Sequence, residues 1–266
     1  MIRDKLARVQ GMLKDMESVV IAFSGGVDST FLLKTAVDVL GDRALAVTAT
    51  SSTYPAGELA QARELAAGLG ARHKLIVSEE LAIEGFADNP PNRCYYCKRE
   101  LFSKLLAVAA AEGIRYVLDG TNYDDLGDHR PGLTAAGELG VRSPLKEAGL
   151  TKEDIRRLSR EMGLSTWDKP SFACLSSRFP YGTRITAEKL GQVDRGETLL
   201  RSLGFHQFRI RHHGEVARIE ITPDQFPLLV AKAAEVVAEL KDCGFTYVTM
   251  DLQGYRTGSM NEVLPG

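Results

Sequence analysis

Three signals that would assign a location or a large partner are missing from this sequence. No stretch approaches the roughly 20 apolar residues that span a bilayer, and residues 1–20 lack the apolar core of a signal peptide. Lys and Arg number 33 against 35 Asp and Glu, so the formal net charge of −2 supplies no global field for holding DNA or RNA. We therefore expect a cytoplasmic protein without a membrane partner or a nucleic acid partner.

Cysteine is also scarce, with four in 266 residues. Cys94 and Cys97 form a Cys-Tyr-Tyr-Cys run. In a reducing compartment this spacing suits metal, cluster or dithiol chemistry better than a structural disulfide. Cys243 lies near the end of an expected helix, where a packing role is the simplest interpretation.

The order of apolar runs and helical patterns predicts an α/β fold. Strand-type runs are expected at 19–23, 44–50, 74–77 and 115–118, and helices at 29–40, 58–69, 99–111 and 151–162, the last with Thr151 as its N-cap. Strands that alternate with helices in this way form a parallel sheet covered by helices on both faces.

After an irregular linker at 171–181 the pattern changes to that of an α+β module. Helices are expected at 187–203 and 225–241, and strands at 205–211, 216–221 and 245–252. This order resembles part of a ferredoxin-like sandwich. We therefore divide the chain into a first domain at 1–180 and a smaller second domain at 181–266, which is a candidate surface for assembly into a homo-oligomer.

The run Ser-Gly-Gly-Val-Asp-Ser at 24–29 directly follows the first expected strand and opens the first helix. Its glycines let the backbone approach a ligand, and the helix N-terminus and the serine hydroxyls offer donors to phosphate oxygens. The run lacks the Gly-Lys-Ser/Thr ending of a Walker A loop and is not a dinucleotide fingerprint, so ordinary kinases, GTPases and dehydrogenases lose support. The candidate ligand residues are Ser24, Gly25, Gly26, Asp28 and Ser29.

Polar residues also end two other strands of the expected sheet. Thr50 ends the second strand, and Gly120 and Thr121 follow the fourth. Ligands of open α/β sheets bind outside the carboxyl ends of the strands, so these residues are candidates to border adenine and ribose. Each segment alone could equally be a solvated loop.

The run at 24–29 resembles the loop of the ATP pyrophosphatase (PP-loop) superfamily, which includes GMP synthetase, NAD synthetase and tRNA thiolation enzymes. The resemblance implies a Rossmann-like, adenine nucleotide alpha hydrolase-like domain that cleaves ATP between the α and β phosphates and holds pyrophosphate in the loop. Asp28 would then be a ligand or an indirect partner of Mg²⁺, which prefers hard oxygen donors. The alternative from the residues alone is a glycine-rich turn without a ligand.

Cys174 lies in an irregular segment that also contains the basic residues Lys169, Arg178 and Arg184. Positive charge favours the thiolate form that a nucleophile needs. A small buried packing residue is the alternative that the local composition allows.

The segment around Cys174, Lys-Pro-Ser-Phe-Ala-Cys-Leu-Ser-Ser-Arg-Phe-Pro-Tyr-Gly, together with the loop at 24–29, resembles the LarE family. These pyridinium biscarboxylic acid mononucleotide sulfurtransferases build the nickel-pincer cofactor of lactate racemase. The resemblance implies that ATP adenylates a carboxylate of the mononucleotide and that Cys174 attacks the acyl-adenylate, so that the thioester yields a thiocarboxylate. Some members sacrifice the matching cysteine, which becomes dehydroalanine.

Cys94 and Cys97 offer a second route for the sulfur. Together with Cys174 they could hold a [4Fe-4S] cluster with one iron open to an external sulfide, the route implied by three-cysteine members of the family. One alternative is a zinc site completed by a histidine such as His129. Another is two thiols without a metal.

Arg209 and Arg211 alternate along an expected strand, which places both guanidinium groups on one face. Arg binds phosphate in a bidentate manner, and the resemblance implies that this pair and Glu197 border the phosphate of the mononucleotide. The alternative is a solvated strand face that pairs with Glu215 or Glu220.

Two further residues are candidate substrate contacts. Arg178 lies close to Cys174 in the sequence, and the ring of Tyr95 could stack on a pyridinium ring, although aromatic residues beside cysteines often only pack.

Two rival functions stay open. A tRNA thiolase of the same superfamily would need a basic RNA-binding face, and a non-catalytic nucleotide-binding protein would release no pyrophosphate.

Overall fold

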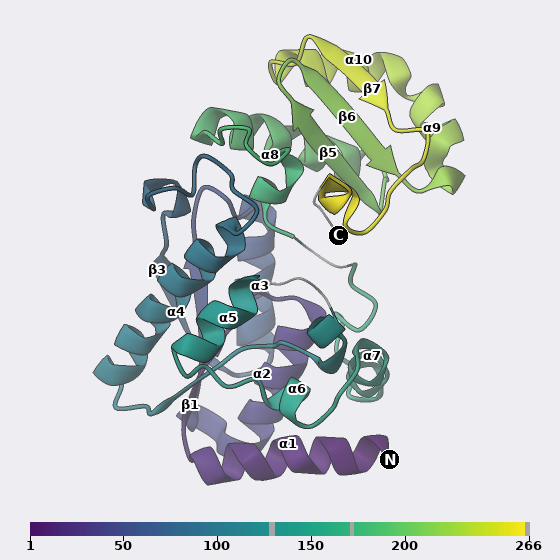
Figure 1. The fold of residues 1–266 in the computed structure, drawn as a ribbon. Helices are drawn as coiled ribbons and strands as arrows, with labels where there is room; N and C mark the ends of the chain where they lie inside the picture. The colour runs from purple at the N-terminus through teal and green to yellow at the C-terminus, as the bar shows by residue number, and fades with distance from the viewer. Residues whose placement is uncertain (128–130, 171–172, 264–266) are drawn as a thin grey trace. The chain divides into compact units, whose positions relative to one another are not determined.

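The computed structural model describes residues 1–127, 131–170 and 173–263, and the chain forms two compact units (Figure 1). Residues 1–80 and 92–172 form the first unit, and residues 81–91 and 173–266 form the second. No helix within the described ranges is long and apolar enough to cross a membrane.

The division into units differs from the expected one at 180/181 because the segment 81–91 belongs to the second unit. The side chain of Asn89 donates to the carbonyl of Phe179 at 3.2 Å and to that of Pro180 at 2.7 Å. These bonds join residues far apart in the chain, so no local pattern indicates them.

The first unit is built on a four-stranded parallel sheet in the order β3-β2-β1-β4. Its strands are β1 (Val19–Ala22), β2 (Ala44–Thr50), β3 (Arg72–Val77) and β4 (Tyr116–Leu118). Its helices are α1 (Ile2–Met16), α2 (Val27–Leu40), α3 (Ala56–Gly68), α4 (Arg93–Ala111), α5 (Pro131–Glu138), α6 (Pro144–Glu147) and α7 (Lys152–Glu161). The α/β class and the parallel sheet are confirmed.

Strand β1 is buried on both faces, as a parallel sheet covered by helices requires. Val19 and Ile21 belong to a core that includes Phe31 of α2, whereas Val20 belongs to a second core that includes Phe102 of α4. Successive side chains of a strand point to opposite faces, so one apolar strand contributes to both cores. The expected cover of helices on both faces is therefore confirmed.

Helix α7 begins at the expected N-cap. Thr151 Oγ1 accepts from the Asp154 amide at 3.1 Å, and Asp154 Oδ2 accepts from the Thr151 amide at 3.2 Å. The two bonds form a capping box, which satisfies amide groups that have no partner within the helix. The short helices α5 and α6 were not expected, because neither is long enough to show an apolar period.

Helix α4 begins at Arg93 rather than at residue 99. Residues 93–98 are polar or aromatic and carry no apolar period, so the pattern missed the first part of the helix. The earlier start places both Cys94 and Cys97 on the helix, where a spacing of three residues puts them on one side.

The second unit contains a three-stranded sheet in the order β5-β6-β7 (Figure 1). Its strands are β5 (Phe208–His213), β6 (Val216–Ile221) and β7 (Tyr247–Met250), and its helices are α8 (Ala187–Ser202), α9 (Phe226–Ala231) and α10 (Ala233–Asp242). Strands β5 and β6 are antiparallel, whereas β6 and β7 are parallel and are joined by the helical crossover. The expected α+β arrangement is confirmed.

Short 3-10 helices complete the chain. They are η1 (Gly41–Arg43), η2 (Glu80–Ala82), η3 (Tyr123–Gly127), η4 (Leu175–Arg178), η5 (Pro223–Gln225) and η6 (Ser259–Asn261).

Two details of the second unit correct the sequence pattern. The single helix expected at 225–241 breaks at Lys232, whose φ of −96° and ψ of 7° lie outside the helical range. The strand expected at 205–211 is β5 at 208–213, so it includes His212 and His213 and ends before the turn that contains Gly214 at φ 66°. His212 lies 5.0 Å from the ring of Phe179 between centroids, and burial lowers the pKa of this histidine to about 4.

Two glycines of α8 test how tightly the second unit is packed. A Cβ at Gly196 would lie 2.6 Å from Ile210 Cδ1 and 2.7 Å from Leu240 Cδ2, whereas the nearest atom to one at Gly191 is 3.9 Å away. We expect Gly196→Ala to lower the free energy of unfolding by about 1–3 kcal/mol relative to Gly191→Ala, because the added methyl overpacks the core. Both variants gain the same helix propensity. Urea unfolding measures the difference, and equal midpoints would contradict the packing.

Candidate functional site

The loop at 24–29 makes a sharp turn between β1 and α2. Gly25 has φ of 68°, and a Cβ there would lie 3.2 Å from the Cα of Ala62. The hydroxyls of Ser24 and Ser29 are 3.1 Å apart, and Gly26 is the N-cap of α2. The turn thus combines two hydroxyls with the amide end of a helix, which is an arrangement suited to phosphate.

Asp28 lies in the first turn of α2 and has two different carboxylate oxygens. Its Oδ2 pairs with Lys152 Nζ at 2.5 Å, whereas its Oδ1 is buried and has no hydrogen-bond partner among the described residues. A buried carboxylate oxygen without a partner is costly unless a ligand completes it. The oxygen is a hard donor within the loop at 24–29, which we call the phosphate loop after its predicted role. Asp28 therefore fits the predicted role as a ligand of Mg²⁺.

The neighbouring strand ends carry the residues expected to border the nucleoside. Gly120 follows β4, and a Cβ at this position would lie 3.0 Å from the amide nitrogen of Ser29, so the close approach favours glycine. The Thr121 hydroxyl donates to Asp119 at 2.8 Å, and the Thr50 hydroxyl donates to the carbonyl of Ile76 at 3.3 Å. These two hydroxyls are thus held in fixed directions at the carboxyl edge of the sheet.

Lys169 contacts the phosphate loop, which the sequence did not indicate. Its ammonium donates to the carbonyl of Gly25 at 3.2 Å, to the carboxylate of Glu58 at 2.7 Å and to the amide oxygen of Gln61. The sequence grouped Lys169 with the basic residues around Cys174. Its observed partners are instead the loop and helix α3.

Tyr54 is a second contact that the sequence missed. Its hydroxyl donates to the carbonyl of Ser24 at 2.8 Å, and burial, together with Glu58, raises the pKa of this tyrosine so that it stays a donor. The C=O and N–H of a trans peptide point in opposite directions. The donors on the carbonyls of Ser24 and Gly25 therefore fix the directions of the next two loop amides.

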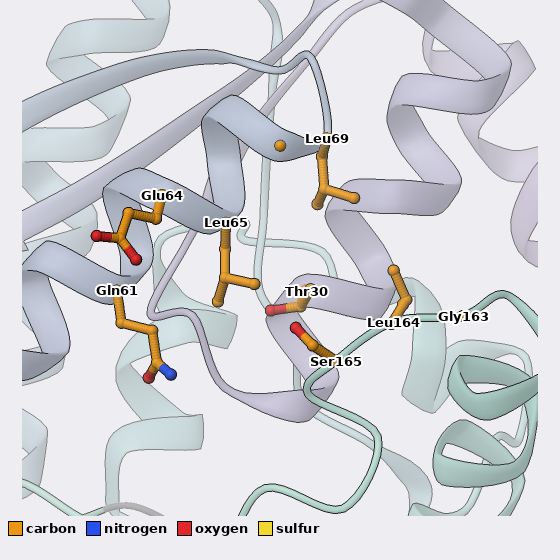
Figure 2. A pocket seen from close by; sticks show the side chains of 9 residues that line it. Thr30, Gln61, Glu64, Leu65, Leu69, Gly163, Leu164 and Ser165 are labelled. Carbon is orange, nitrogen blue, oxygen red and sulfur yellow. The ribbon is translucent and has the colours of Figure 1, made fainter.

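A cavity of about 410 Å³ lies between α2, α3 and the segment that follows α7 (Figure 2). Its described lining includes Thr30, Gln61, Leu65 and Ser165, but no residue predicted to bind nucleotide. In Figure 2 the hydroxyls of Thr30 and Ser165 point toward the same space. We therefore place the candidate nucleotide site at the loop and the sheet edge, where the phosphate donors are, and not in this cavity.

Cys94 and Cys97 lie one turn apart on α4. Cys94 is exposed, Cys97 is partly buried, and neither forms a disulfide. The Cys97 thiol lies 3.9 Å from an oxygen of the buried Glu80, and the Tyr95 hydroxyl donates to Glu138 at 2.6 Å, which raises the pKa of Tyr95. Two thiols are thus presented on one side of a helix.

The part of the chain that the structure describes contains no complete metal site. No group of three Cys, His, Asp or Glu side chains within the described ranges could hold a metal ion. His129, the histidine suggested for a zinc site, lies outside those ranges.

Cys174 is the N-cap of η4 in the second unit and is partly buried. Its carbonyl accepts from Ser177 Oγ at 2.8 Å and from Arg178 Nη1 at 2.9 Å, and Nη1 also donates to the carbonyl of Ala173 at 2.6 Å. The guanidinium therefore fixes the backbone that carries the thiol. The third basic residue, Arg184, is exposed and pairs with Asp88 at 3.3 Å.

Arg178 is itself held by Glu197. Two parallel bonds of 2.8 Å join their side chains, which are only 1% and 5% exposed. Burial alone would raise the pKa of Glu197, but the Arg178 guanidinium outweighs it and lowers that pKa. Glu197 also accepts from the Ile210 amide at 3.1 Å, so the pair connects the Cys174 segment to α8 and β5.

Arg209 and Arg211 lie two residues apart on β5, as expected. Arg211 binds Glu220 through two nitrogens, at 3.0 and 2.7 Å, so the predicted alternative partner Glu220 is present but buried rather than solvated. The guanidinium of Arg209 lies 5.2 Å from the ring centroid of Tyr255. Burial, and after it the nearby positive charge of Arg178, lowers the pKa of Arg209, while Glu197 and Tyr255 act in the opposite direction.

The chain is similar to proteins of known and unknown function. A family model described as asparagine synthase matches residues 2–126. An uncharacterised protein of Synechocystis sp. is 46% identical over 99% of both chains. The pyridinium-3,5-bisthiocarboxylic acid mononucleotide synthase of Lactiplantibacillus plantarum is 42% identical over 98% of this chain and 95% of that protein. The glutamine-hydrolysing GMP synthase of Phaeosphaeria nodorum is 28% identical over 73% of this chain and 40% of that protein.

Loss of one partner of the buried Arg178–Glu197 pair should strongly destabilise the second unit. We expect Glu197→Gln to cost about 3–5 kcal/mol, because it leaves the buried charge of Arg178 unpaired. Glu188→Gln, an exposed change on the same helix, should cost about 0.5 kcal/mol or less. Chemical denaturation at neutral pH measures both variants, and equal costs would contradict the argument.

The same pair predicts a dependence on pH. The pKa of Glu197 is lowered in the folded state, so the carboxylate stabilises the fold above its unfolded pKa of about 4.3. This contribution is lost as the pH falls through the lower, folded pKa. The difference in unfolding free energy between the wild type and Glu197→Gln should therefore shrink on acidification, and a constant difference would be evidence against the pair.

Proposed function

This chain belongs to the family of the pyridinium-3,5-bisthiocarboxylic acid mononucleotide synthases, the LarE family, and we propose that it catalyses their kind of reaction. It is an ATP-dependent sulfurtransferase that adenylates a carboxylate of pyridinium biscarboxylic acid mononucleotide and converts it to a thiocarboxylate for the nickel-pincer cofactor. The observation that carries the proposal is 42% identity over 98% of the chain, which includes both units.

The first step is adenylation in the first unit. A carboxylate oxygen of the substrate attacks the α-phosphorus of ATP, and the bond to the bridging oxygen breaks to release pyrophosphate. Ser24, Gly25, Gly26 and Ser29 supply hydroxyls and helix amides that receive the negative charge, and Asp28 would hold a Mg²⁺ ion, which would supply further neutralising charge there. Thr50, Gly120 and Thr121 are the residues proposed to border the adenosine.

The second step transfers sulfur. A sulfur nucleophile attacks the acyl carbon, and AMP leaves with the electrons of the broken C–O bond. If Cys174 supplies its own sulfur, its thiolate forms a thioester. Loss of the Cα proton to solvent together with cleavage of the Cβ–S bond then leaves a thiocarboxylate on the product and dehydroalanine in the chain. Arg178 fixes the carbonyl of Cys174 and so holds the thiol-bearing segment still.

The substrate contacts are proposed from the second unit and α4. Arg209, Arg211 and Glu197 border the phosphate of the mononucleotide, and Tyr95 stacks on its pyridinium ring. In support, Arg209 and Arg211 share one side of β5, and the charge of Arg209 is stacked on an aromatic ring.

We propose further that Cys94, Cys97 and Cys174 ligate a [4Fe-4S] cluster, so that turnover does not consume the polypeptide. The donor set fits, because all three are thiols outside disulfides, and Cys94 and Cys97 share one side of α4. When bound, such a cluster would have one iron without a cysteine ligand. That iron would hold an external sulfide for transfer to the substrate. The cytoplasmic location and the homo-oligomer remain predictions from the sequence.

Anaerobic incubation with ATP and the mononucleotide tests the function. We expect pyrophosphate, AMP and a thiocarboxylate product, with the mass of the protein unchanged if a cluster delivers the sulfur. A protein that loses H₂S in mass would instead support sacrifice of Cys174. Sulfur found on tRNA would assign the chain to the tRNA thiolases, and no pyrophosphate release would identify a non-catalytic nucleotide-binding protein.

Serine variants of each cysteine test the cluster. Cys94→Ser, Cys97→Ser and Cys174→Ser should each lower the iron content and the visible absorbance after anaerobic reconstitution, because each removes one thiolate. Cys243→Ser is the matched control, since Cys243 packs against the second-unit core, and its iron content should equal that of the wild type. Zinc without iron in the wild type, or iron unaffected by the three changes, would reject the cluster.

A further inference from the structure

Lys152 occupies the carboxylate that the proposed function gives to Mg²⁺. Its ammonium lies 2.5 Å from Asp28 Oδ2, and the two side chains are 33% and 23% exposed. The other oxygen of Asp28 is buried without a hydrogen-bond partner among the described residues. An internal cation therefore neutralises one oxygen of the carboxylate, while the other oxygen is left without a partner among the described residues.

The lysine is placed there by the start of α7. Lys152 is the first residue of that helix, directly after the Thr151 cap, and its own amide donates to Asp124 Oδ2 at 2.8 Å. Ile155 of the same helix belongs to the core that contains Phe31 of α2. The backbone of Lys152 is thus fixed by a cap, a hydrogen bond and a packed helix, while its flexible side chain reaches the phosphate loop.

We propose that Lys152 is an internal counter-ion that competes with the divalent cation for Asp28. While the ammonium holds Oδ2, the carboxylate is neutralised and attracts a divalent cation less strongly. A bound nucleotide brings negative charge of its own, and the Lys152 ammonium then pairs with that charge instead of with Asp28. The Asp28 carboxylate is left to bind the divalent cation. Lys152 thereby makes cation binding at Asp28 depend on the nucleotide, an inference that rests on the proposed function of the loop.

The effect of the pair is measurable because it acts on affinity without nucleotide. A partly exposed ion pair is worth about 0.2–1 kcal/mol, so removing it should tighten cation binding by up to about fivefold. Mn²⁺ takes the same oxygen ligands and geometry as Mg²⁺ and can be counted by electron paramagnetic resonance.

The test titrates the nucleotide-free, full-length protein with Mn²⁺. We expect Lys152→Met to bind Mn²⁺ about 1.4-fold to fivefold more tightly than the wild type, and Lys152→Arg, which keeps the cation, to match the wild type. Asp28→Asn should remove the gain when it is combined with Lys152→Met. A Lys152→Met variant that binds no more tightly, or a gain that survives Asp28→Asn, would overturn the proposal.

Lys34→Met is the matched control. Lys34 also lies 2.5 Å from a carboxylate of α2, that of Asp38, and its side chain is 30% exposed, but the pair is separate from the loop. Its Mn²⁺ affinity should equal that of the wild type. An equal gain in Lys34→Met would show a general effect of net charge and would also overturn the proposal.

The proposal and the proposed function fail in different ways. A wild-type protein that releases no pyrophosphate would remove the function, while the Mn²⁺ titration would still measure the competition at Asp28. Normal sulfur transfer with equal Mn²⁺ affinities in the wild type and Lys152→Met would keep the function and reject the counter-ion. Thermal unfolding of each variant identifies a substitution that disturbs α7. Such a disturbance would weaken Mn²⁺ binding, whereas loss of the counter-ion should tighten it.

Discussion

Parallel pairing of β1 with β2 and β4 is the constraint on which the first unit depends. Parallel neighbours cannot be joined by tight turns, so each connection returns through a helix and the helices cover both faces. The same pairing brings the carboxyl ends of the strands to one edge, where polar groups from distant segments meet. The loop at 24–29, Thr50 and Gly120 share this edge because of strand direction.

The second unit holds its polar residues by a different means. Arg178 and Arg211 are buried, and each is bound by a buried carboxylate, Glu197 or Glu220. Such pairs contribute little net stability, but a single partner left alone is strongly unfavourable, so they fix which surfaces can meet. The first unit instead uses the less buried lysines Lys152 and Lys169, which can exchange their partners at lower cost.

The sequence predicted what depends on local periodicity and missed what depends on distance along the chain. The β1 to α2 loop, the Thr151 cap and the α/β alternation follow from neighbours within a few residues, and all are present. Lys152 and Lys169 reach the loop across separations of 124 and 144 residues, and no spacing rule encodes such contacts. The break at Lys232 is local but was still missed, because the residues on both sides of it favour helix.

The contact between Gly120 and Ser29 limits how the phosphate loop can be reused. A Cβ on Gly120 would lie 3.0 Å from the amide nitrogen of Ser29, so a larger residue would require the two segments to move apart. The six residues of the loop therefore do not specify its conformation alone, because the loop also depends on Gly120 at the end of β4. A designer who grafts the loop onto a new parallel sheet must transplant that glycine and the strand spacing with it.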